Sequence, residues 1–190
     1  MHALQKKPPV LECKKNNQNG GESMSSKNVV LIGMPGSGKS TVGVVLAKVL
    51  GYQFIDSDLE IQKQEGKRLP ELIEEFGTEG FLDIEGRVNA SIEADHCVIA
   101  TGGSVVYREE AMRHLKEIGT VVYLKLSCEQ LKERLGDLRC RGVALQEGQT
   151  LEGLYEERIP LYEKYADLVV DETDMSVEQT MEQVALKYKA

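Results

Sequence analysis

A glycine-rich octapeptide, GMPGSGKS at residues 33–40, constrains the fold of this chain more than any other feature. It matches the pattern G-x-x-x-x-G-K-[S/T] at every position. An apolar run ends at Ile32 just before it, and the helical pattern TVGVVLAKVL follows Ser40 directly. A strand, a glycine turn and a helix in this order form a phosphate-binding loop, because backbone N–H groups at the helix N-terminus point at the anion. The segment therefore predicts a nucleotide-binding α/β domain.

The loop residues are the predicted contacts of the nucleotide phosphates. Glycines let the backbone N–H groups turn inward around the phosphate oxygens. The Lys39 ammonium is expected at the outer phosphates, and the Ser40 hydroxyl is expected to take a place on Mg²⁺. The predicted nucleotide-binding residues of this segment are Gly33, Gly36, Ser37, Gly38, Lys39, Ser40 and Thr41.

The rest of the chain alternates between short apolar runs and longer amphipathic runs. The short runs are rich in Val and Ile without clean alternation, which is typical of strands buried on both faces. Strands separated by helices predict parallel crossovers, hence an α/β fold with a five-stranded parallel sheet and helices on both faces. The predicted strands are 28–33, 52–56, 97–101, 120–126 and 167–171. The predicted helices are 39–50, 58–65, 70–93 with an interruption near Gly77, 108–118, 128–135, 150–165 and 176–188.

Length and composition favour one domain preceded by a tail. The chain has 190 residues, a length that suits a single hydrophobic core. Residues 1–26 are polar and lack apolar periodicity, which predicts a flexible N-terminal tail before a domain at 27–190. A polar, basic, glycine-containing stretch at about 136–149 lies between the fourth and fifth strands, and a loop of this kind is often a lid.

Charge and cysteine content limit the partners and the compartment. The net charge of −8 argues against a nucleic-acid partner but allows a local basic pocket for a small anion. No run is long and apolar enough to cross a membrane, and the N-terminus lacks the apolar core of a secretory signal. The four cysteines, Cys13, Cys97, Cys128 and Cys140, have no metal-binding spacing and are expected as free thiols. We expect a cytoplasmic protein, monomeric by default, that acts on a small molecule.

Two carboxylates, Asp56 and Asp58, follow the second predicted strand. Ligands bind at the carboxyl ends of strands in open α/β sheets, so this pair is a candidate for metal or substrate binding. The alternative is structural, with Asp58 or Ser57 as the N-cap of the next helix and Asp56 exposed to solvent.

At this point the chain resembles the shikimate kinase family, P-loop kinases with a nucleoside-monophosphate-kinase-like fold that phosphorylate a hydroxyl of a small carboxylated ring. The resemblance covers about residues 27–188. It rests on the P-loop, on Asp56 and Asp58 at 17 and 19 residues after Lys39, and on three further segments. These are Thr101-Gly102-Gly103-Ser104 after the third strand, Arg134-Leu135-Gly136 followed by Arg141, and Arg158 within ERIPLYEKYAD.

The resemblance implies ATP and Mg²⁺ as the ligands of the donor site. Lys39 and the loop amides would hold the β- and γ-phosphates. Ser40 and Asp56 would position Mg²⁺, directly or through a water molecule. Arg134 would pack on adenine. These roles agree with phosphoryl transfer, which depends mainly on positioning and charge neutralisation.

The resemblance also implies an acceptor site. Asp58 would bind the acceptor hydroxyl and act as its base, next to Gly102 and Gly103. Arg158 would bind the acceptor carboxylate. Arg141 would close over the transferring phosphoryl group, with Arg139 as its competitor for that role.

Three positions depart from the family pattern. A second carboxylate-binding arginine should follow Phe81, and Leu82 stands there instead. Arg87 lies about 140° further around the helix and cannot replace it. Ser104 replaces the third glycine of a triplet, and the lid reads Arg-Gly-Val-Ala-Leu at 141–145, where the family usually has Arg-Pro-Leu-Leu.

The loss of the arginine leaves three predictions for the activity. The first is a kinase that converts shikimate to shikimate 3-phosphate in aromatic amino acid biosynthesis. The second is a kinase of another small hydroxylated metabolite, such as a gluconate-like acid or a hydroxy-amino acid. The third is a nucleotide-binding protein with little transfer activity.

Overall fold

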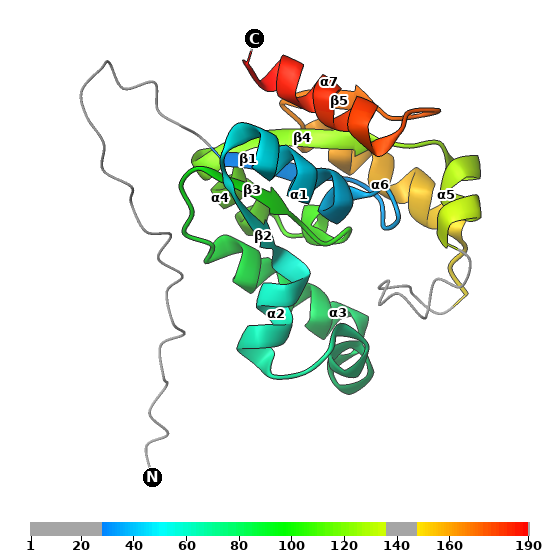
Figure 1. Ribbon diagram of the computed structural model, residues 1–190. Helices are drawn as coiled ribbons and strands as arrows, with labels where there is room; N and C mark the ends of the chain where they lie inside the picture. The colour runs from blue at the N-terminus through cyan, green and yellow to red at the C-terminus, as the bar shows by residue number, and fades with distance from the viewer. Residues whose placement is uncertain (1–27, 136–147, 190) are drawn as a thin grey trace.

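Five parallel strands form one sheet in the order β2-β3-β1-β4-β5, with helices on both of its faces (Figure 1). The computed structural model describes residues 28–135 and 148–189. This arrangement confirms the predicted α/β fold with a parallel sheet of five strands. The strands are β1 (Asn28–Ile32), β2 (Gln53–Asp56), β3 (Cys97–Ala100), β4 (Gly119–Lys125) and β5 (Leu168–Asp171).

Each predicted helix is present, with shifts of a few residues at some ends. The helix expected from 58 begins at Ser57, and the one expected to reach 93 ends at Ala90. A short 3-10 turn, which the sequence pattern did not predict, follows β3. The helices are α1 (Lys39–Leu50), α2 (Ser57–Glu65), α3 (Leu69–Ala90), η1 (Val105–Tyr107), α4 (Glu109–Ile118), α5 (Cys128–Leu135), α6 (Leu151–Tyr165) and α7 (Val177–Lys189).

The central strand β1 is buried on both faces. Val29 and Leu31 belong to a core cluster with residues of α1 and α7. Val30 and Ile32 belong to a second cluster with residues of α4, α5 and α6. Side chains alternate along a strand, so each face of β1 needs an apolar cover of its own. This explains the continuous apolar run that the sequence shows here.

A third, smaller cluster joins α2 and α3, which extend beyond the β2 edge of the sheet (Figure 1). Ile61, Leu72 and Phe81 are among its buried members. Gly77 interrupts α3 with φ 69° and ψ 178°, a conformation that favours glycine. The interruption expected near Gly77 is therefore confirmed, and it lies shortly before the turn of helix that carries Phe81.

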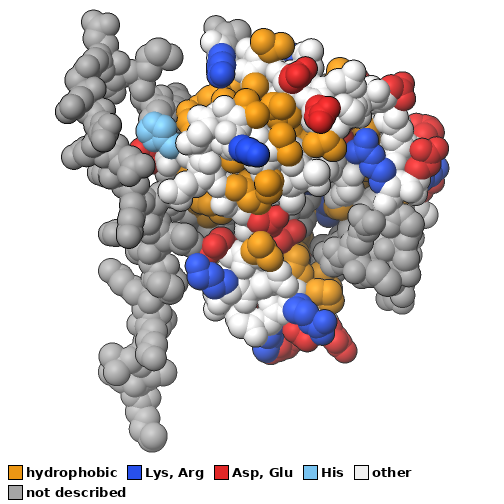
Figure 2. Space-filling view, in the orientation of Figure 1, with side chains coloured by type: hydrophobic (Ala, Val, Ile, Leu, Met, Phe, Trp, Pro, Cys, Tyr) orange, Lys and Arg blue, Asp and Glu red, His pale blue; other side chains and the backbone are white. Residues whose placement is uncertain are grey.

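One exposed face of the molecule is rich in apolar side chains. Val44 and Val49 on α1 and Leu186 on α7 are exposed, and Figure 2 shows hydrophobic side chains gathered over α1.

None of the described helices is long and apolar enough to span a bilayer. The predicted tail, residues 1–26, and the predicted lid up to residue 147 lie outside the described residues, as do Cys13 and Cys140. Cys97 and Cys128 are free thiols.

The carboxyl ends of three neighbouring strands meet at one edge of the sheet. Leu31 and Asp56 both pair with Ala100. The P-loop, the start of α2 and the turn after β3 therefore leave the sheet side by side. This edge is where ligands bind in open α/β sheets.

Candidate active site

The P-loop forms with the backbone geometry that its glycines predict. Gly33, Gly36 and Gly38 all have positive φ, at 148°, 83° and 89°. At Gly33 a β-carbon would also stand 2.6 Å from the carbonyl oxygen of Leu124. The loop leads directly into α1, whose first residue is Lys39.

Lys39 folds back over the loop that precedes it. Its Nζ donates hydrogen bonds to the carbonyl oxygens of Gly33, at 2.9 Å, and Met34, at 2.8 Å. The side chain is buried, and this burial lowers its pKa to about 8, although Asp58 and Glu172 act in the opposite direction. An anion at the loop would offer this ammonium the countercharge that the two carbonyl groups lack.

Ser40 and Asp56 lie side by side at the mouth of the loop. Ser40 Oγ donates a 2.7 Å hydrogen bond to Asp56 Oδ2. Asp56 Oδ1 accepts a 3.0 Å bond from the backbone N–H of Asp58 and caps α2. The alternative in which Asp58 or Ser57 is the N-cap and Asp56 is merely exposed is therefore wrong, because Asp56 itself ends β2 and caps the helix.

The oxygens of Ser40 and Asp56 suit Mg²⁺ bound together with phosphate. Mg²⁺ usually takes one or two protein carboxylates and completes its shell with phosphate oxygens and water. Among the described residues, no group of three or more His, Cys, Asp or Glu could hold a metal ion. The donor set at this edge therefore fits a nucleotide-bound Mg²⁺ ion.

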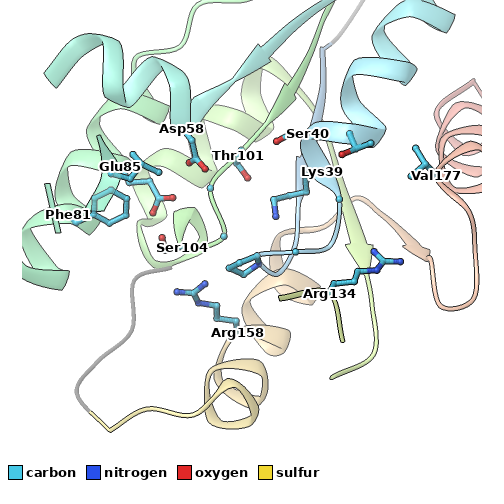
Figure 3. A pocket seen from close by; sticks show the side chains of 17 residues that line it. Lys39, Ser40, Asp58, Phe81, Glu85, Thr101, Ser104, Arg134, Arg158 and Val177 are labelled. Carbon is cyan, nitrogen blue, oxygen red and sulfur yellow. The ribbon is translucent and has the colours of Figure 1, made fainter. Parts of the chain in front are cut away.

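One cavity of about 560 Å³ joins the P-loop to the start of α2 (Figure 3). Lys39 and Ser40 lie at the loop side, and Asp58 and Glu85 project into the cavity from α2 and α3. Arg134 and Arg158 approach from α5 and α6. The remaining lining residues are Pro35, Gly36, Gly38, Thr41, Leu69, Phe81, Thr101, Gly102, Gly103, Ser104 and Val177.

The environment of Asp58 raises the pKa of its carboxyl group to about 6. Burial is the main cause, and the neighbouring negative charge of Asp56 adds to it. The Lys39 ammonium partly offsets both effects. A carboxylate with this pKa is ionised near neutral pH and remains basic enough to accept a proton from a bound hydroxyl group.

The two glycines after β3 allow a close approach of side chains from three elements. A β-carbon on Gly102 would stand 2.0 Å from Glu85 Oε1 and 2.9 Å from Asp58 Oδ1. One on Gly103 would stand 2.7 Å from Pro35 and 3.2 Å from Arg158 Nη1. A side chain at position 103 would meet the ring of Pro35, and one at position 102 would displace the carboxyl ends of Glu85 and Asp58, although neither glycine has a φ that favours glycine.

Arg158 is the buried cation at the far side of the cavity from Ser40. Its side chain is 1% exposed, although it comes from the surface helix α6. Nε donates a 3.2 Å hydrogen bond to the Tyr107 hydroxyl group, and the guanidinium lies 5.1 Å from the centre of the Tyr107 ring. A guanidinium at the end of the cavity that holds Asp58 can bind an acidic group of a small ligand.

Arg134 lines the cavity near the P-loop. Its Nη1 donates a 3.2 Å hydrogen bond to Glu172 Oε1, just after β5. Burial raises the pKa of Glu172 to about 7, against the lowering effect of Arg134 and Lys39. Arg134 is therefore held at the edge of the predicted nucleotide site.

Leu82 is not among the residues that line the main cavity. It is 5% exposed and lines a second cavity of about 140 Å³ together with Tyr107, Arg108 and Arg158. Arg87, also on α3, is bound to Glu65 at 2.6 Å on the outside of the molecule. The prediction that Arg87 cannot replace an arginine at position 82 agrees with this contact.

The structure brings most of the predicted site residues together in one place. Lys39, Ser40, Asp58 and Arg158 line one cavity, with Gly102 and Gly103 between them. Asp56 touches Ser40 at the cavity edge. Arg141 and its competitor Arg139 lie outside the described residues.

Several lining residues were not predicted as site residues, and Glu85 is the most important. Burial raises the pKa of its carboxyl group to about 7, and its side chain is hydrogen-bonded to Ser104. Oε2 has no hydrogen-bond partner within the described residues. Phe81 and Glu85 are four residues apart on α3 and so share a helix face, and both belong to the segment in which Leu82 departs from the family pattern.

The family model and the curated relatives that this chain resembles are shikimate kinases. The model of the shikimate kinase family matches residues 35–189. A shikimate kinase from Thermodesulfovibrio yellowstonii is 38% identical over 166 residues, covering 86% of this chain and 95% of the relative. One from Synechococcus sp. is 41% identical over 166 residues, covering 85% of this chain and 82% of the relative. The solved structure of shikimate kinase from Acinetobacter baumannii in complex with shikimate superposes with a TM-score of 0.77 at 31% identity, covering 85% and 92%.

Proposed function

The chain belongs to the shikimate kinase family, and we propose that it transfers the γ-phosphoryl group of ATP to a hydroxyl group of shikimate. One observation carries this proposal. The cavity that contains Lys39 and Ser40 of the P-loop also contains Asp58 and Arg158. A phosphoryl donor and a carboxylated acceptor can therefore lie in contact in the same space.

The donor end would be built from the P-loop. Lys39 would exchange its two carbonyl partners for the β- and γ-phosphate oxygens. Ser40 and Asp56 would hold Mg²⁺, and the ion would offset the negative charge on these phosphates. Arg134 would pack against the adenine base, held in place by its contact with Glu172.

The acceptor end would be built from α2, the turn after β3 and α6. Arg158 would bind the carboxylate of the acceptor, and Asp58 its reacting hydroxyl group. The backbone of Gly102 and Gly103 forms the wall between them. A hydroxyl held against Asp58 faces the P-loop, because Asp58 and Lys39 are close enough for their charges to interact.

The transfer step needs few protein groups. The acceptor oxygen forms a bond to the γ-phosphorus while the bond from this phosphorus to the β,γ-bridging oxygen breaks, and ADP leaves. Asp58 accepts the proton of the attacking hydroxyl group and later releases it to water. Arg141, in the predicted lid, would offset the charge that spreads over the phosphoryl oxygens.

A coupled assay of ADP release tests the reaction. The full chain is given ATP and Mg²⁺ with shikimate, gluconate, hydroxy-amino acids or nucleoside monophosphates in turn. We expect turnover with shikimate. Turnover with another acceptor and none with shikimate would contradict the proposed acceptor. The comparison is needed because Leu82 stands where the family pattern has a carboxylate-binding arginine.

The role of Asp58 is tested by Asp58→Asn. Loss of the base should lower kcat by about 10²–10⁴-fold while the affinity for ATP is retained. Asp95→Asn serves as the control. Asp95 is exposed, lies outside the cavity and contacts His96. Unchanged turnover in Asp58→Asn would remove this residue from the mechanism.

A further inference from the structure

We propose that Tyr107 is a positioning residue for the acceptor site, and that it orients Arg158 so that this one guanidinium can bind the acceptor carboxylate without a second arginine at position 82. The inference rests on the proposed function and goes beyond it. It assigns to Tyr107, in the short turn η1, a part in acceptor specificity.

The first argument is the contact between the two residues. Tyr107 approaches Arg158 with both of its binding groups, because the hydroxyl oxygen accepts the Nε hydrogen bond and the ring lies under the guanidinium. The Tyr107 hydroxyl in turn donates a 2.8 Å hydrogen bond to Glu157 Oε1. Gln149 donates a further 2.8 Å bond to Glu157 Oε2. The hydrogen bond to the Glu157 carboxylate thus fixes the orientation of the Tyr107 hydroxyl group.

The second argument is where the two side chains lie relative to the cavities. Arg158 lines both the main cavity and the smaller one, whereas Tyr107 lines only the smaller one. Arg158 Nη1 approaches Gly103, in the wall of the main cavity. Figure 3 shows the guanidinium directed toward the side formed by Glu85 and Ser104. Tyr107 therefore contacts the Nε side of the group, while Nη1 lies at the wall of the main cavity.

The third argument is the charge at the acceptor end. Of the described residues that line the main cavity, three are cations, and Lys39 and Arg134 belong to the nucleotide side. Arg158 is the remaining cation, and its charge acts on the carboxyl group of Glu85. Two arginines on separate helices would confine a carboxylate by themselves. A single long side chain does so only when its own rotation is restricted.

Arg108 does not take the place of the missing arginine. It lines the smaller cavity beside Leu82, but its guanidinium is bound to Asp83 at 2.9 Å and Glu79 at 3.0 Å. Both partners are exposed carboxylates on α3. Arg108 is therefore engaged on the outside of the helix, and it provides a matched control next to Tyr107 in the chain.

The experiment compares Tyr107→Phe, Tyr107→Leu and Arg108→Gln in the full chain, with shikimate and with shikimate methyl ester. The ester lacks the negative charge that Arg158 would bind. It is measured as a substrate or, if turnover is too slow, as a competitive inhibitor of shikimate phosphorylation. The KM for ATP and the thermal unfolding temperature report whether each variant keeps its fold.

We expect a KM effect that depends on the carboxylate. Tyr107→Leu removes the hydrogen bond and the ring, and should raise the KM for shikimate about tenfold with kcat and the KM for ATP little changed. Tyr107→Phe keeps the ring and should raise it about threefold. The constants for the methyl ester should be the same in all variants, and Arg108→Gln should behave as the unaltered chain.

Two outcomes would overturn the inference. One is a Tyr107→Leu variant in which the KM rises equally for shikimate and its methyl ester, or for neither. If the leucine variant unfolds, the same comparison is made with Tyr107→Phe, which retains the ring packing. The other is a larger rise of the shikimate KM in Arg108→Gln than in the Tyr107 variants. Absence of shikimate turnover in the unaltered chain would count against the proposed function instead, and would be seen before any variant is made.

Discussion

Ser40 Oγ and Asp56 Oδ2 are joined by a 2.7 Å hydrogen bond, although 16 residues separate them in the chain. The bond ties the first turn of α1 to the end of β2. It brings together the hydroxyl and the carboxylate that would share Mg²⁺. The second oxygen of Asp56 caps α2, so one side chain combines a structural contact with a contact available to the metal.

Asp56→Asn should raise the Mg²⁺ concentration needed for half-maximal activity by at least about tenfold, since a contact to a charged partner contributes roughly 1.5–3 kcal/mol. Asparagine keeps an oxygen for the helix cap, so the free energy of unfolding should change little. Activity measured against Mg²⁺ at fixed ATP checks this. Asp171→Asn is the control, because Asp171 also ends a strand but does not line the cavity. An unchanged Mg²⁺ requirement in Asp56→Asn would contradict the assignment.

The pH dependence of the acceptor step should follow the carboxyl group of Asp58. This group must be ionised to accept a proton, and its pKa is raised to about 6. The kcat/KM for the acceptor should therefore decrease as the pH falls through about 6. Because the charge of Asp56 contributes to the raised pKa, Asp56→Asn should move this decrease to lower pH. A profile between pH 5 and pH 8 measures both effects, and a decrease that stays in place in the variant would argue against Asp58 as the titrating group.

Gly102→Ala should close the acceptor site while sparing the fold. The new methyl group would lie 2.0 Å from Glu85 Oε1 and 2.9 Å from Asp58 Oδ1, so both carboxyl groups would have to move. We expect kcat/KM for the acceptor to drop at least about 100-fold, since a misplacement of about 1 Å in a reacting group has this effect. The KM for ATP should stay close to its original value.

Gly153→Ala is the matched control for this substitution. Gly153 lies in α6, and its nearest neighbour would be Thr150 Oγ1 at 3.5 Å, an ordinary contact. Alanine is favoured over glycine within a helix by up to about 1 kcal/mol. The control should therefore keep full activity and unfold at the same or a higher temperature. Similar kinetics in the two alanine variants would show that the close approach at Gly102 is not needed.

Glu85→Gln should stabilise the protein more at pH 8 than at pH 5. Burial raises the pKa of this carboxyl group to about 7 in the folded state, above its usual value near 4.3 in an unfolded chain. The folded state is therefore penalised as the pH rises from about 4.5 to 7, and the penalty is constant above that range.

The size of the effect and its control follow from the same shift. The difference between the folded and unfolded pKa corresponds to an upper limit of about 4 kcal/mol, at 1.36 kcal/mol per pH unit. Denaturant unfolding at pH 5 and pH 8 measures it. Glu93→Gln, at an exposed position before β3, should give no gain at pH 8. An equal gain for Glu85→Gln at both pH values would mean that packing, and not ionisation, is responsible.

Much of the fold could be predicted from local patterns. Five apolar runs mark the strands because a sheet covered on both faces needs apolar side chains on each, as β1 shows with Val29 and Val30. Gly77 marks the break in α3 because its positive φ favours glycine. The ends of helices were less predictable. Asp56 is the last residue of β2 and at the same time the N-cap of α2, so the strand decides where this helix begins.

The donor side of the site was also predictable, because the P-loop is a contiguous segment. Lys39 and Ser40 lie where the spacing predicts, and Asp56 and Asp58 lie at the carboxyl end of β2, the next strand along the chain. The physical reason is that a strand, a turn and a helix place their backbone N–H groups by local geometry alone. The acceptor assignments of Gly102 and Arg158 came from the family resemblance.

What only the tertiary structure decided is how distant residues share one cavity. Tyr107 and Arg158 are 51 residues apart, and no periodicity connects them. The position of Leu82 on the smaller cavity and of Glu85 on the main one depends on the rotation of α3 after Gly77. The amino-acid sequence by itself determined the sheet and the phosphate-binding loop, which arise from neighbouring residues. The surroundings of the acceptor carboxylate arise from the packing of η1, α3 and α6, and long-range packing is not encoded in any single segment.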